Sequence, residues 1–267
     1  MFDDKFRVCF ADTPHGLELH QRIRYQVFCL EKGFEDPAAF SRERETDAWD
    51  DQAAHFVVQD KRSGQWVAAT RVVLPHPSRK LPVETLQSIE PPIELPPDAR
   101  VGEISRFCII NAKEIEVAPV SVAVQDELAR WDIGSVASRE RFEVILGMLR
   151  AVAIFSLKRD IDYCYMLITP PFVRLLRKLG VVLHQAGAPV EYRGKRSPYM
   201  ADMRESIQNM IGRSREVKKL FARARLSYVR ISKVVQDPEV ELVSEFSPEH
   251  SLFNETLFRE TVLQPEE

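Results

Sequence analysis

The segment ARVGEISRFCII (99–110) precedes the helical pattern of RERFEVILGMLRAVAIFSLK (139–158), which leads directly into DYCYMLIT (162–169). The outer two segments are apolar and contain many β-branched or aromatic residues, as buried strands do, whereas the apolar residues of the middle segment recur at helical spacing. Two strands joined by a long crossover helix form a parallel βαβ unit. We therefore expect an α/β fold in which helices flank both faces of a mixed central β-sheet.

The rest of the chain supplies the other parts of such a sheet. Residues 16–32 have helical periodicity and stop at Gly33. The runs 54–59 and 66–74 predict a β-hairpin, because the turn sequence DKRSG separates two strand-like segments. Further along, we expect a helix at 170–180, closing strands at 181–187 and around 197–203, and one basic amphipathic helix at 203–225.

Composition indicates a soluble protein. The 267 residues are 45% hydrophobic and 29% charged, and no apolar run reaches the roughly 20 residues of a membrane-spanning helix. The N-terminal sequence lacks the basic and apolar regions of a secretory signal, so we expect a cytoplasmic protein. One domain is predicted over 1–225 with an insertion at 111–138, followed by a loosely attached acidic extension over 226–267. Seven prolines between Pro75 and Pro97 predict a long ordered loop.

The net charge of −3 hides an uneven distribution. Residues 139–230 contain 19 basic and 8 acidic side chains, whereas residues 1–138 contain 16 and 23, and residues 231–267 contain 2 and 9. A basic band attracts anionic partners, such as nucleic acid, membrane surfaces, nucleotide cofactors or acidic carrier proteins. No interleaved aromatic and basic pattern supports nucleic acid. The four scattered cysteines have no C-x-x-C pair and no histidine at metal spacing, so we expect reduced thiols and no metal site.

Charged residues inside apolar strands are the strongest indication of a functional site. Arg71 lies within VAATRVVL, and Glu103 and Arg106 interrupt VGEISRFCII, where an unpaired charge is costly. Such charges are commonly structural, but they also gather at sites that bind small polar substrates. We predict a partly buried network in which Arg24, Arg71 and Arg106 face Asp47, Asp50 and Glu103.

The order and spacing of these residues resemble a known family. Arg24-x3-Phe28, Asp47-x2-Asp50, Arg71 and Glu103-Ile-Ser-Arg106-Phe107 resemble the N-terminal signature of the acyl-homoserine-lactone synthases and the related N-acyl amino acid synthases, which have the acetyltransferase (GNAT) fold. Phe34 stands where that family is expected to have a tryptophan, and it preserves an aromatic wall. The segment Tyr192-Arg193-Gly194-x-Arg196-x-Pro198-Tyr199 is similar to acyltransferases associated with the PEP-CTERM/exosortase system. The resemblance covers about residues 20–110 and 139–203.

This resemblance implies transfer of an acyl group from a phosphopantetheine thioester, on acyl carrier protein or coenzyme A, to an amine, with no permanently bound cofactor. Glu103, in a partly desolvated strand, is the expected general base that deprotonates the amine. Asp47 and Asp50 are expected to hold the substrate ammonium or to orient the arginines. Any of the three arginines is suited to bidentate binding of an amino-acid carboxylate; they are Arg24, Arg71 and Arg106.

The predicted strand at 99–110 is expected to make further contacts with the substrate. Backbone N–H groups around Phe107 and Cys108 are expected to meet the tetrahedral oxyanion. In a regular strand Glu103 and Arg106 point to opposite faces. A shared site therefore requires a β-bulge near Ser105 and Arg106. Besides Phe107 and Cys108, the expected substrate contacts are Phe28, Phe34 and Ser105.

The glycine-rich coenzyme A loop typical of acetyltransferases does not precede the helix at 139–158, so an acidic acyl carrier protein is the expected donor. Its expected docking face contains Arg139, Arg141, Arg150, Lys158, Arg174, Arg177 and Lys178. A peripheral contact with anionic lipid is a further expectation for the last basic helix; it would involve Lys218, Lys219, Arg223 and Arg225.

The sequence thus favours an N-acyltransferase that joins a fatty acyl chain from a carrier thioester to the amine of an amino acid or a similar small metabolite. Two alternatives stay open. One is an acetyltransferase that uses coenzyme A directly. The other is a non-catalytic module that binds lipid, nucleic acid or another anion through the basic band, although it would leave the buried charges without a purpose.

Overall fold

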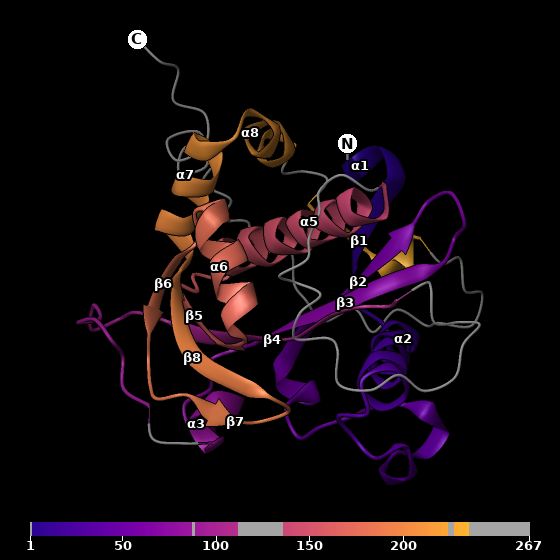
Figure 1. Cartoon of the computed structure of the whole chain (residues 1–267), viewed down its shortest axis with the longest axis horizontal. Helices are drawn as coiled ribbons and strands as arrows, with labels where there is room; N and C mark the ends of the chain where they lie inside the picture. Colours follow the sequence, from indigo (N-terminus) through magenta and orange to yellow (C-terminus); the bar gives the residue numbers. More distant parts are fainter. Residues whose placement is uncertain (1, 87–88, 112–135, 224–226, 235–267) are drawn as a thin grey trace.

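The computed structural model describes residues 2–86, 89–111, 136–223 and 227–234, which are built around one mixed β-sheet (Figure 1). Within these residues the strand order is β6-β8-β5-β4-β3-β2-β1-β9, and β7 pairs with β8 off this path. The β4–β5 and β1–β9 pairs are parallel and the others are antiparallel. The strands are β1 (Phe6–Phe10), β2 (Ala53–Asp60), β3 (Trp66–Val73), β4 (Val101–Ile109), β5 (Tyr163–Ile168), β6 (Val182–Gln185), β7 (Val190–Glu191), β8 (Lys195–Asp202) and β9 (Val229–Arg230).

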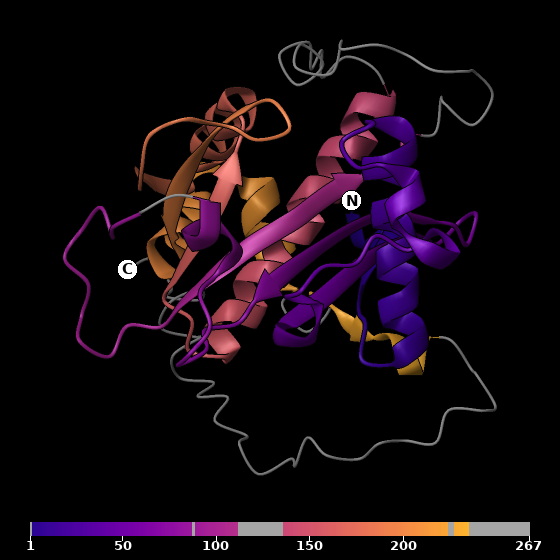
Figure 2. The ribbon, with the colours of Figure 1, turned by 90° about the horizontal axis from the view of Figure 1, so that it is seen from below.

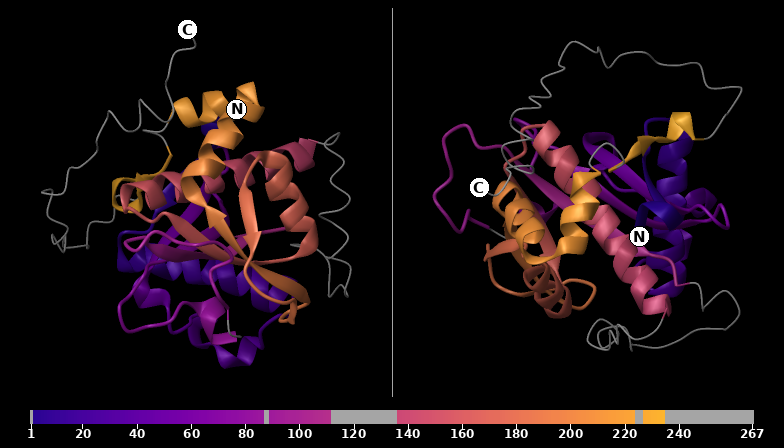
Figure 3. Two further views of the ribbon diagram at one scale, coloured as in Figure 1. Left: turned by 90° about the vertical axis from the view of Figure 1, so that its left-hand side faces the viewer. Right: turned by 90° about the horizontal axis from the view of Figure 1, so that it is seen from above.

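Helices cover both faces of the sheet, as predicted (Figures 1 and 3). On one face α5 packs against Phe56 of β2, and on the other α2 packs against Val57, because neighbouring strand residues point to opposite faces. The described α-helices are α1 (Phe2–Lys5), α2 (Pro14–Tyr25), α3 (Pro82–Leu86), α5 (Val136–Lys158), α6 (Pro170–Leu179), α7 (Met203–Arg213) and α8 (Arg215–Ala222). The shorter turns are the π-helical η1 (Gln26–Glu31) and the 3-10 turns η2 (Pro37–Ala39), η3 (Ser41–Glu43), η4 (Asp50–Gln52) and η6 (Ile231–Lys233).

The predicted βαβ unit is present as β4, α5 and β5. β4 and β5 pair in parallel register from Val101 opposite Tyr163 to Glu103 opposite Tyr165. Beyond Glu103 the described part of β4 has no partner on β5, and the two strands separate (Figure 2). An opening inside a sheet leaves backbone N–H and C=O groups available to a ligand.

A β-bulge in β4 confirms the irregularity expected near Ser105 and Arg106. Ala69 of β3 is opposite Cys108, and Arg71 is opposite Ser105, so a two-residue step on β3 faces a three-residue step on β4. Arg106 itself has a φ angle of 53°, in the left-handed region. A non-glycine residue there is strained, and such residues cluster at functional sites.

The hairpin predicted from 54–59 and 66–74 is confirmed as β2 and β3. The helix expected over 203–225 is instead two helices, because Ser214 ends α7 and its hydroxyl caps α8. The N-terminal strand β1 was not predicted, since five residues are too few to show periodicity. Within the proline-rich loop, five residues form α3.

Two predicted segments fall largely outside the described residues. They are the insertion at 111–138 and the extension at 226–267. In the part of the chain that the structure describes, none of the helices has both the length and the apolar character needed to cross a membrane.

Candidate active site

A cavity of about 1100 Å³ opens where β4 and β5 separate. One part of its wall is apolar and comes from β4, β5, α5 and α6; its residues include Ile104, Phe107, Ile145, Met166, Ile168 and Phe172. Another part is charged and includes Glu45, Asp47, Glu103 and Arg106. A mostly apolar cavity with a few convergent polar groups is the usual form of a small-molecule site.

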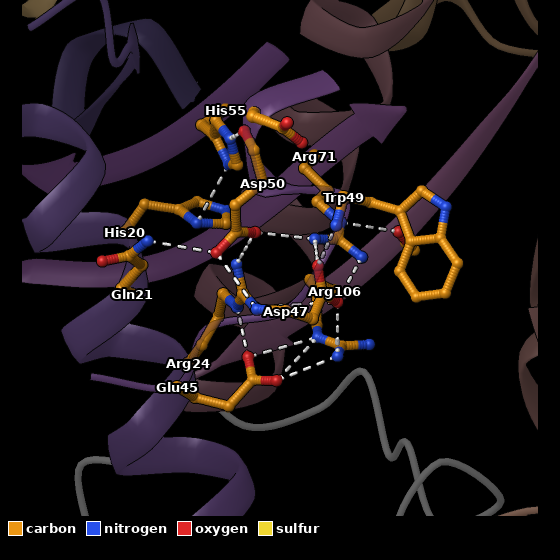
Figure 4. A network of polar contacts seen from close by, with 12 residues as sticks. His20, Gln21, Arg24, Glu45, Asp47, Trp49, Asp50, His55, Arg71 and Arg106 are labelled. Atoms are coloured by element: carbon orange, nitrogen blue, oxygen red, sulfur yellow. Dashed lines mark hydrogen bonds and ion pairs between the residues drawn. The ribbon is translucent and has the colours of Figure 1, made fainter. Parts of the chain in front are cut away.

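A network of buried ion pairs lies at the charged side of this cavity (Figure 4). The structure brings all three predicted arginines together with Asp47 and Asp50, but the third carboxylate is Glu45 rather than Glu103. The predicted place of Glu103 in the network is therefore wrong. The network contains three cations and three anions, namely Arg24, Arg71 and Arg106 with Glu45, Asp47 and Asp50.

Arg71 occupies the centre of this network and is fully buried. Its Nη1 donates to Asp47 Oδ1 at 2.6 Å and to Asp50 Oδ1 at 2.7 Å, and its Nη2 donates to Asp47 Oδ2 at 2.7 Å. Its Nε donates to the Ser105 hydroxyl at 3.0 Å. Burial alone would raise the pKa of Asp47, but the hydrogen bonds and charge of Arg71 hold it well below its usual value.

The other two arginines join α2 and β4 to the same acidic segment. Arg24 Nε donates to Glu45, and its Nη1 donates to Asp50 Oδ1 at 2.5 Å. Arg106 Nη2 donates to Glu45 Oε1 at 2.9 Å and to Asp47 Oδ2 at 2.8 Å. Arg24 and Glu45 are almost completely buried. The need for three carboxylates beside three arginines was recognisable in the sequence, but it does not distinguish Glu45 from Glu103.

Glu103 lies apart from the ion pairs, on a cavity wall next to α3. Its Oε2 accepts the backbone N–H of Val83 at 2.8 Å, and only 3% of the residue is exposed. Burial raises the pKa of Glu103 to about 8, although the Val83 N–H and the charges of Arg71 and Arg106 oppose the rise. A carboxyl group with a pKa near 8 can exchange protons with an amine close to neutral pH.

Two aromatic rings form part of the cavity wall, and their contact with substrate stays a prediction. The rings of Phe28 and Phe34 stack with their centroids 6.4 Å apart. The guanidinium of Arg106 lies 5.8 Å from the centroid of Phe28, and that of Arg196 lies 5.7 Å from the centroid of Phe34. The wall therefore presents cations on aromatic faces, an arrangement that stabilises both. Arg196 also lines the cavity, and its sequence context did not predict this position.

Ser105, Phe107 and Cys108 also line the cavity. The Cys108 thiol is buried, and burial raises its pKa to about 12, so it stays protonated and is a poor nucleophile. Of the predicted substrate contacts, Ser105 additionally accepts a hydrogen bond from Arg71. The role predicted for the backbone N–H groups of Phe107 and Cys108 stays a prediction.

A pair of buried histidines lies next to the ion-pair network. His55 Nε2 lies 2.8 Å from the carbonyl oxygen of Asp50, and His20 Nε2 lies 3.2 Å from that of Thr70. Burial lowers the pKa of His55 to about 4 and that of His20 well below its usual value. Both rings are therefore neutral at physiological pH and serve as hydrogen-bonding struts.

The predicted docking residues occupy different places. Arg150 is fully buried, where it bonds both carboxylate oxygens of Asp3 at 3.0 and 2.6 Å, so its prediction as a docking residue is wrong. Lys158 is exposed but lies about 25 Å along α5 from Arg141, at 1.5 Å per residue. Arg141 and Arg174 line the cavity. The others are exposed, namely Arg139, Arg177 and Lys178.

Comparisons with known proteins identify the fold. Residues 23–113 match the family model described as acetyltransferase (GNAT) domain. The fold is GNAT-like. This match ends just after β4 and covers the ion-pair network and Glu103. No curated protein sequence matches the chain.

Solved structures share the GNAT-like fold with this chain. The AHL synthase LasI is 19% identical, with a TM-score of 0.52 over 78% of this chain and 95% of LasI. TofI, in a ternary complex with an inhibitor and MTA, is 21% identical, with a TM-score of 0.52 over 77% and 96%. BjaI, a CoA-dependent acyl-homoserine lactone synthase with SAM and isopentyl-CoA, is 16% identical, with a TM-score of 0.50 over 85% and 92%. These similarities establish the fold.

Among the residues described, no three His, Cys, Asp or Glu side chains gather as they would around a metal ion.

Proposed function

We propose that this protein is an N-acyltransferase, which transfers a fatty acyl group from a phosphopantetheine thioester to the amine of an amino acid or a similar small metabolite. The observation that carries this proposal is the cavity between β4 and β5, where an apolar wall adjoins Glu103 and the ion-pair network. The apolar wall suits an acyl chain, because burying each methylene group contributes about 0.8 kcal/mol.

The reaction needs one base and a site for a negatively charged oxygen. Ionised Glu103 accepts a proton from the acceptor ammonium, directly or through a water molecule. The neutral amine then attacks the thioester carbonyl, a C–N bond forms, the C–S bond breaks, and the thiolate leaves and takes up a proton from the amine nitrogen. Backbone N–H groups of β4 at Phe107 and Cys108, next to the bulge, are the proposed donors to the tetrahedral oxyanion. No covalent enzyme intermediate is needed.

The ion-pair network acts as a positioning element in this proposal. The side chains of Arg24 and Arg71 are fully buried and are bonded to carboxylates. Removing either would leave buried carboxylates unpaired, which is costly. The network therefore holds β4, α2 and the acidic segment around Asp50 in place and does not itself bind the acceptor.

Acyl carrier protein is the proposed donor. Of the seven docking residues predicted from the sequence, the proposal keeps the three that lie at or near the cavity, namely Arg139, Arg141 and Arg174. Charge reversal at Arg139 and Arg141 should raise KM for an acyl carrier protein thioester and leave KM for the matching coenzyme A thioester nearly unchanged. Equal effects on both donors would place the docking site elsewhere. The association with a PEP-CTERM/exosortase system also belongs to this proposal.

The test of the proposed function measures thiol release and product mass together. Purified protein is incubated with acyl carrier protein or coenzyme A thioesters of several chain lengths and with a panel of amino acids, and products are identified by mass spectrometry. We expect N-acyl products that are lost in Glu103→Gln and kept in Glu205→Gln, which changes an exposed carboxylate on α7. Absence of thiol release with every donor and acceptor would overturn the proposal.

A further inference from the structure

A basic hairpin turn forms part of the cavity mouth. β7 and β8 pair from Val190 opposite Arg196 to Glu191 opposite Lys195, and Tyr192, Arg193 and Gly194 make the turn. Both Arg193 and Gly194 have positive φ angles, of 52° and 88°. All five residues of the turn and its arm, from Tyr192 to Arg196, line the cavity. Left-handed residues of this kind are usual in a three-residue hairpin loop.

Arg196 differs from the arginines of the ion-pair network and from its neighbour Arg193. Arg24, Arg71 and Arg106 each bond to carboxylates, and Arg193 forms an ion pair with Glu35. Arg196 has no carboxylate partner among the described residues. Its Nε is buried without a hydrogen bond, and its Nη2 makes one long contact of 3.4 Å to the carbonyl oxygen of Arg193.

An unpaired, largely buried guanidinium is unfavourable unless an anion compensates it. Arg196 lies over the Phe34 ring, which fixes its plane and leaves its outer donors for a ligand. Burial lowers the pKa of Arg196, and the charge of Arg106 lowers it further, whereas Tyr192 opposes this shift. A planar guanidinium in such a place matches the two oxygens of a carboxylate.

We propose that Arg196 binds the carboxylate of the acceptor, which makes the acceptor class an amino acid with a free carboxylate. This inference rests on the proposed function, because it names the substrate class of the same cavity. It also replaces the sequence-based expectation that Arg24, Arg71 or Arg106 binds this carboxylate. Those three are balanced by Glu45, Asp47 and Asp50.

The donor phosphate is the other anion that such a site could hold. Two observations favour the acceptor. Arg196 and Arg106 sit on the stacked pair Phe34 and Phe28, so Arg196 belongs to the wall that adjoins the network. Two further cations, Arg141 on α5 and Arg174 on α6, also line the cavity, so Arg196 is not required for the donor phosphate.

The first experiment measures binding without catalysis. Isothermal titration calorimetry with L-amino acids and their carboxamides compares wild type with Arg196→Gln in the absence of any thioester. Wild type should bind at least one amino acid and discriminate against its carboxamide by about 10- to 100-fold, the value of one charge-assisted pair. Arg196→Gln should lose that discrimination. Arg196→Lys should keep part of it, because lysine retains the positive charge but cannot donate two parallel hydrogen bonds to a carboxylate.

The second experiment separates the two anions during turnover. If Arg196 binds the acceptor, Arg196→Gln raises KM for the amino acid and leaves KM for the thioester unchanged. If it binds the donor phosphate, the variant raises KM for a phosphopantetheine thioester but not for the dephosphorylated thioester, and the inference is wrong. Arg159→Gln is the matched control, since Arg159 also lies over an aromatic ring, Phe155, at a distant exposed site.

The outcomes of the two experiments distinguish the inference from the proposed function. Unchanged discrimination in Arg196→Gln, with normal folding by circular dichroism, overturns the inference while acyl transfer stands. Binding of amino acids through Arg196 without any thiol release supports the inference and counts against the acyltransferase. Equal binding of amino acids and carboxamides by wild type also overturns the inference.

Discussion

Glu103 should make acyl transfer depend on pH with an apparent pKa near 8. The group is 3% exposed, and its pKa is raised from 4.5 to about 8 mainly by burial. With such a pKa, about one Glu103 in eleven is ionised at pH 7 and about ten in eleven at pH 9. If only ionised Glu103 accepts the proton, kcat/KM rises about tenfold over this range.

Glu103 should also make folding stability depend on pH, but in the opposite direction from activity. Between pH 4.5 and about 8 the folded protein holds a proton on Glu103 that the unfolded chain has released, so the free energy of unfolding falls as pH rises through this window. The full shift corresponds to a loss of at most about 5 kcal/mol. In Glu103→Gln the amide oxygen still accepts the Val83 N–H, and this loss of stability should disappear.

The assay records kcat/KM by thiol release from about pH 6 to pH 9.5 for wild type and Glu103→Gln. Urea unfolding follows the stability of both proteins across the window from pH 4.5 to about 8. The variant should lose about 10²- to 10⁴-fold in rate. The profile is measured with two acceptors whose amine pKa values differ by more than one unit. If Glu103 causes the rise of kcat/KM, the midpoint of that rise is the same for both acceptors. A flat wild-type profile, or a Glu103→Gln variant that keeps both the rate and the step, would refute the assignment.

Two predictions concern the core around α5. Gly147→Ala places a Cβ atom 2.3 Å from the Phe2 ring and should destabilise the fold by about 1–3 kcal/mol in thermal unfolding; Gly212→Ala, with nothing within 4 Å, is the control and should be neutral or slightly stabilising. Asp3→Asn removes the carboxylate charge that bonds both outer nitrogens of the buried Arg150, and should cost about 3–5 kcal/mol. Recovery of stability on adding Arg150→Met would confirm this cause, and a further loss would contradict it.

Local patterns predicted the centre of the fold correctly. The crossover from β4 through α5 to β5 follows from two apolar strands and one long periodic helix, which sequence shows directly. The bulge at Arg106 followed from geometry, because two charges three residues apart in one strand cannot otherwise approach the same side. Pairing of three arginines with acidic residues followed from the cost of burying charge.

What the sequence could not predict depends on contacts between distant segments. The third carboxylate of the network is Glu45 and not Glu103, because the segment with Asp47 and Asp50 brings Glu45 next to Arg106. Local sequence patterns do not show where that segment lies relative to β3 and β4. Arg150 sits on a helix whose other arginines are partly exposed, and only the partner Asp3, distant in sequence, shows that it is buried. The unpaired state of Arg196 likewise appears only in three dimensions.

The bulge and the network together explain why the cavity exists. β4 stays paired with β3 as far as Ile109 but leaves β5 after Glu103, so it must turn away from β5 within a few residues. A bulge adds twist to a strand, and Arg106 provides it with a φ angle that costs about 1–2 kcal/mol. The ion pairs of Arg106 with Glu45 and Asp47 offset this strain. The bulge is therefore held in place by arginines whose charges are neutralised by carboxylates. Arg196, which has no carboxylate partner among the described residues, is the cation that we propose binds the acceptor carboxylate.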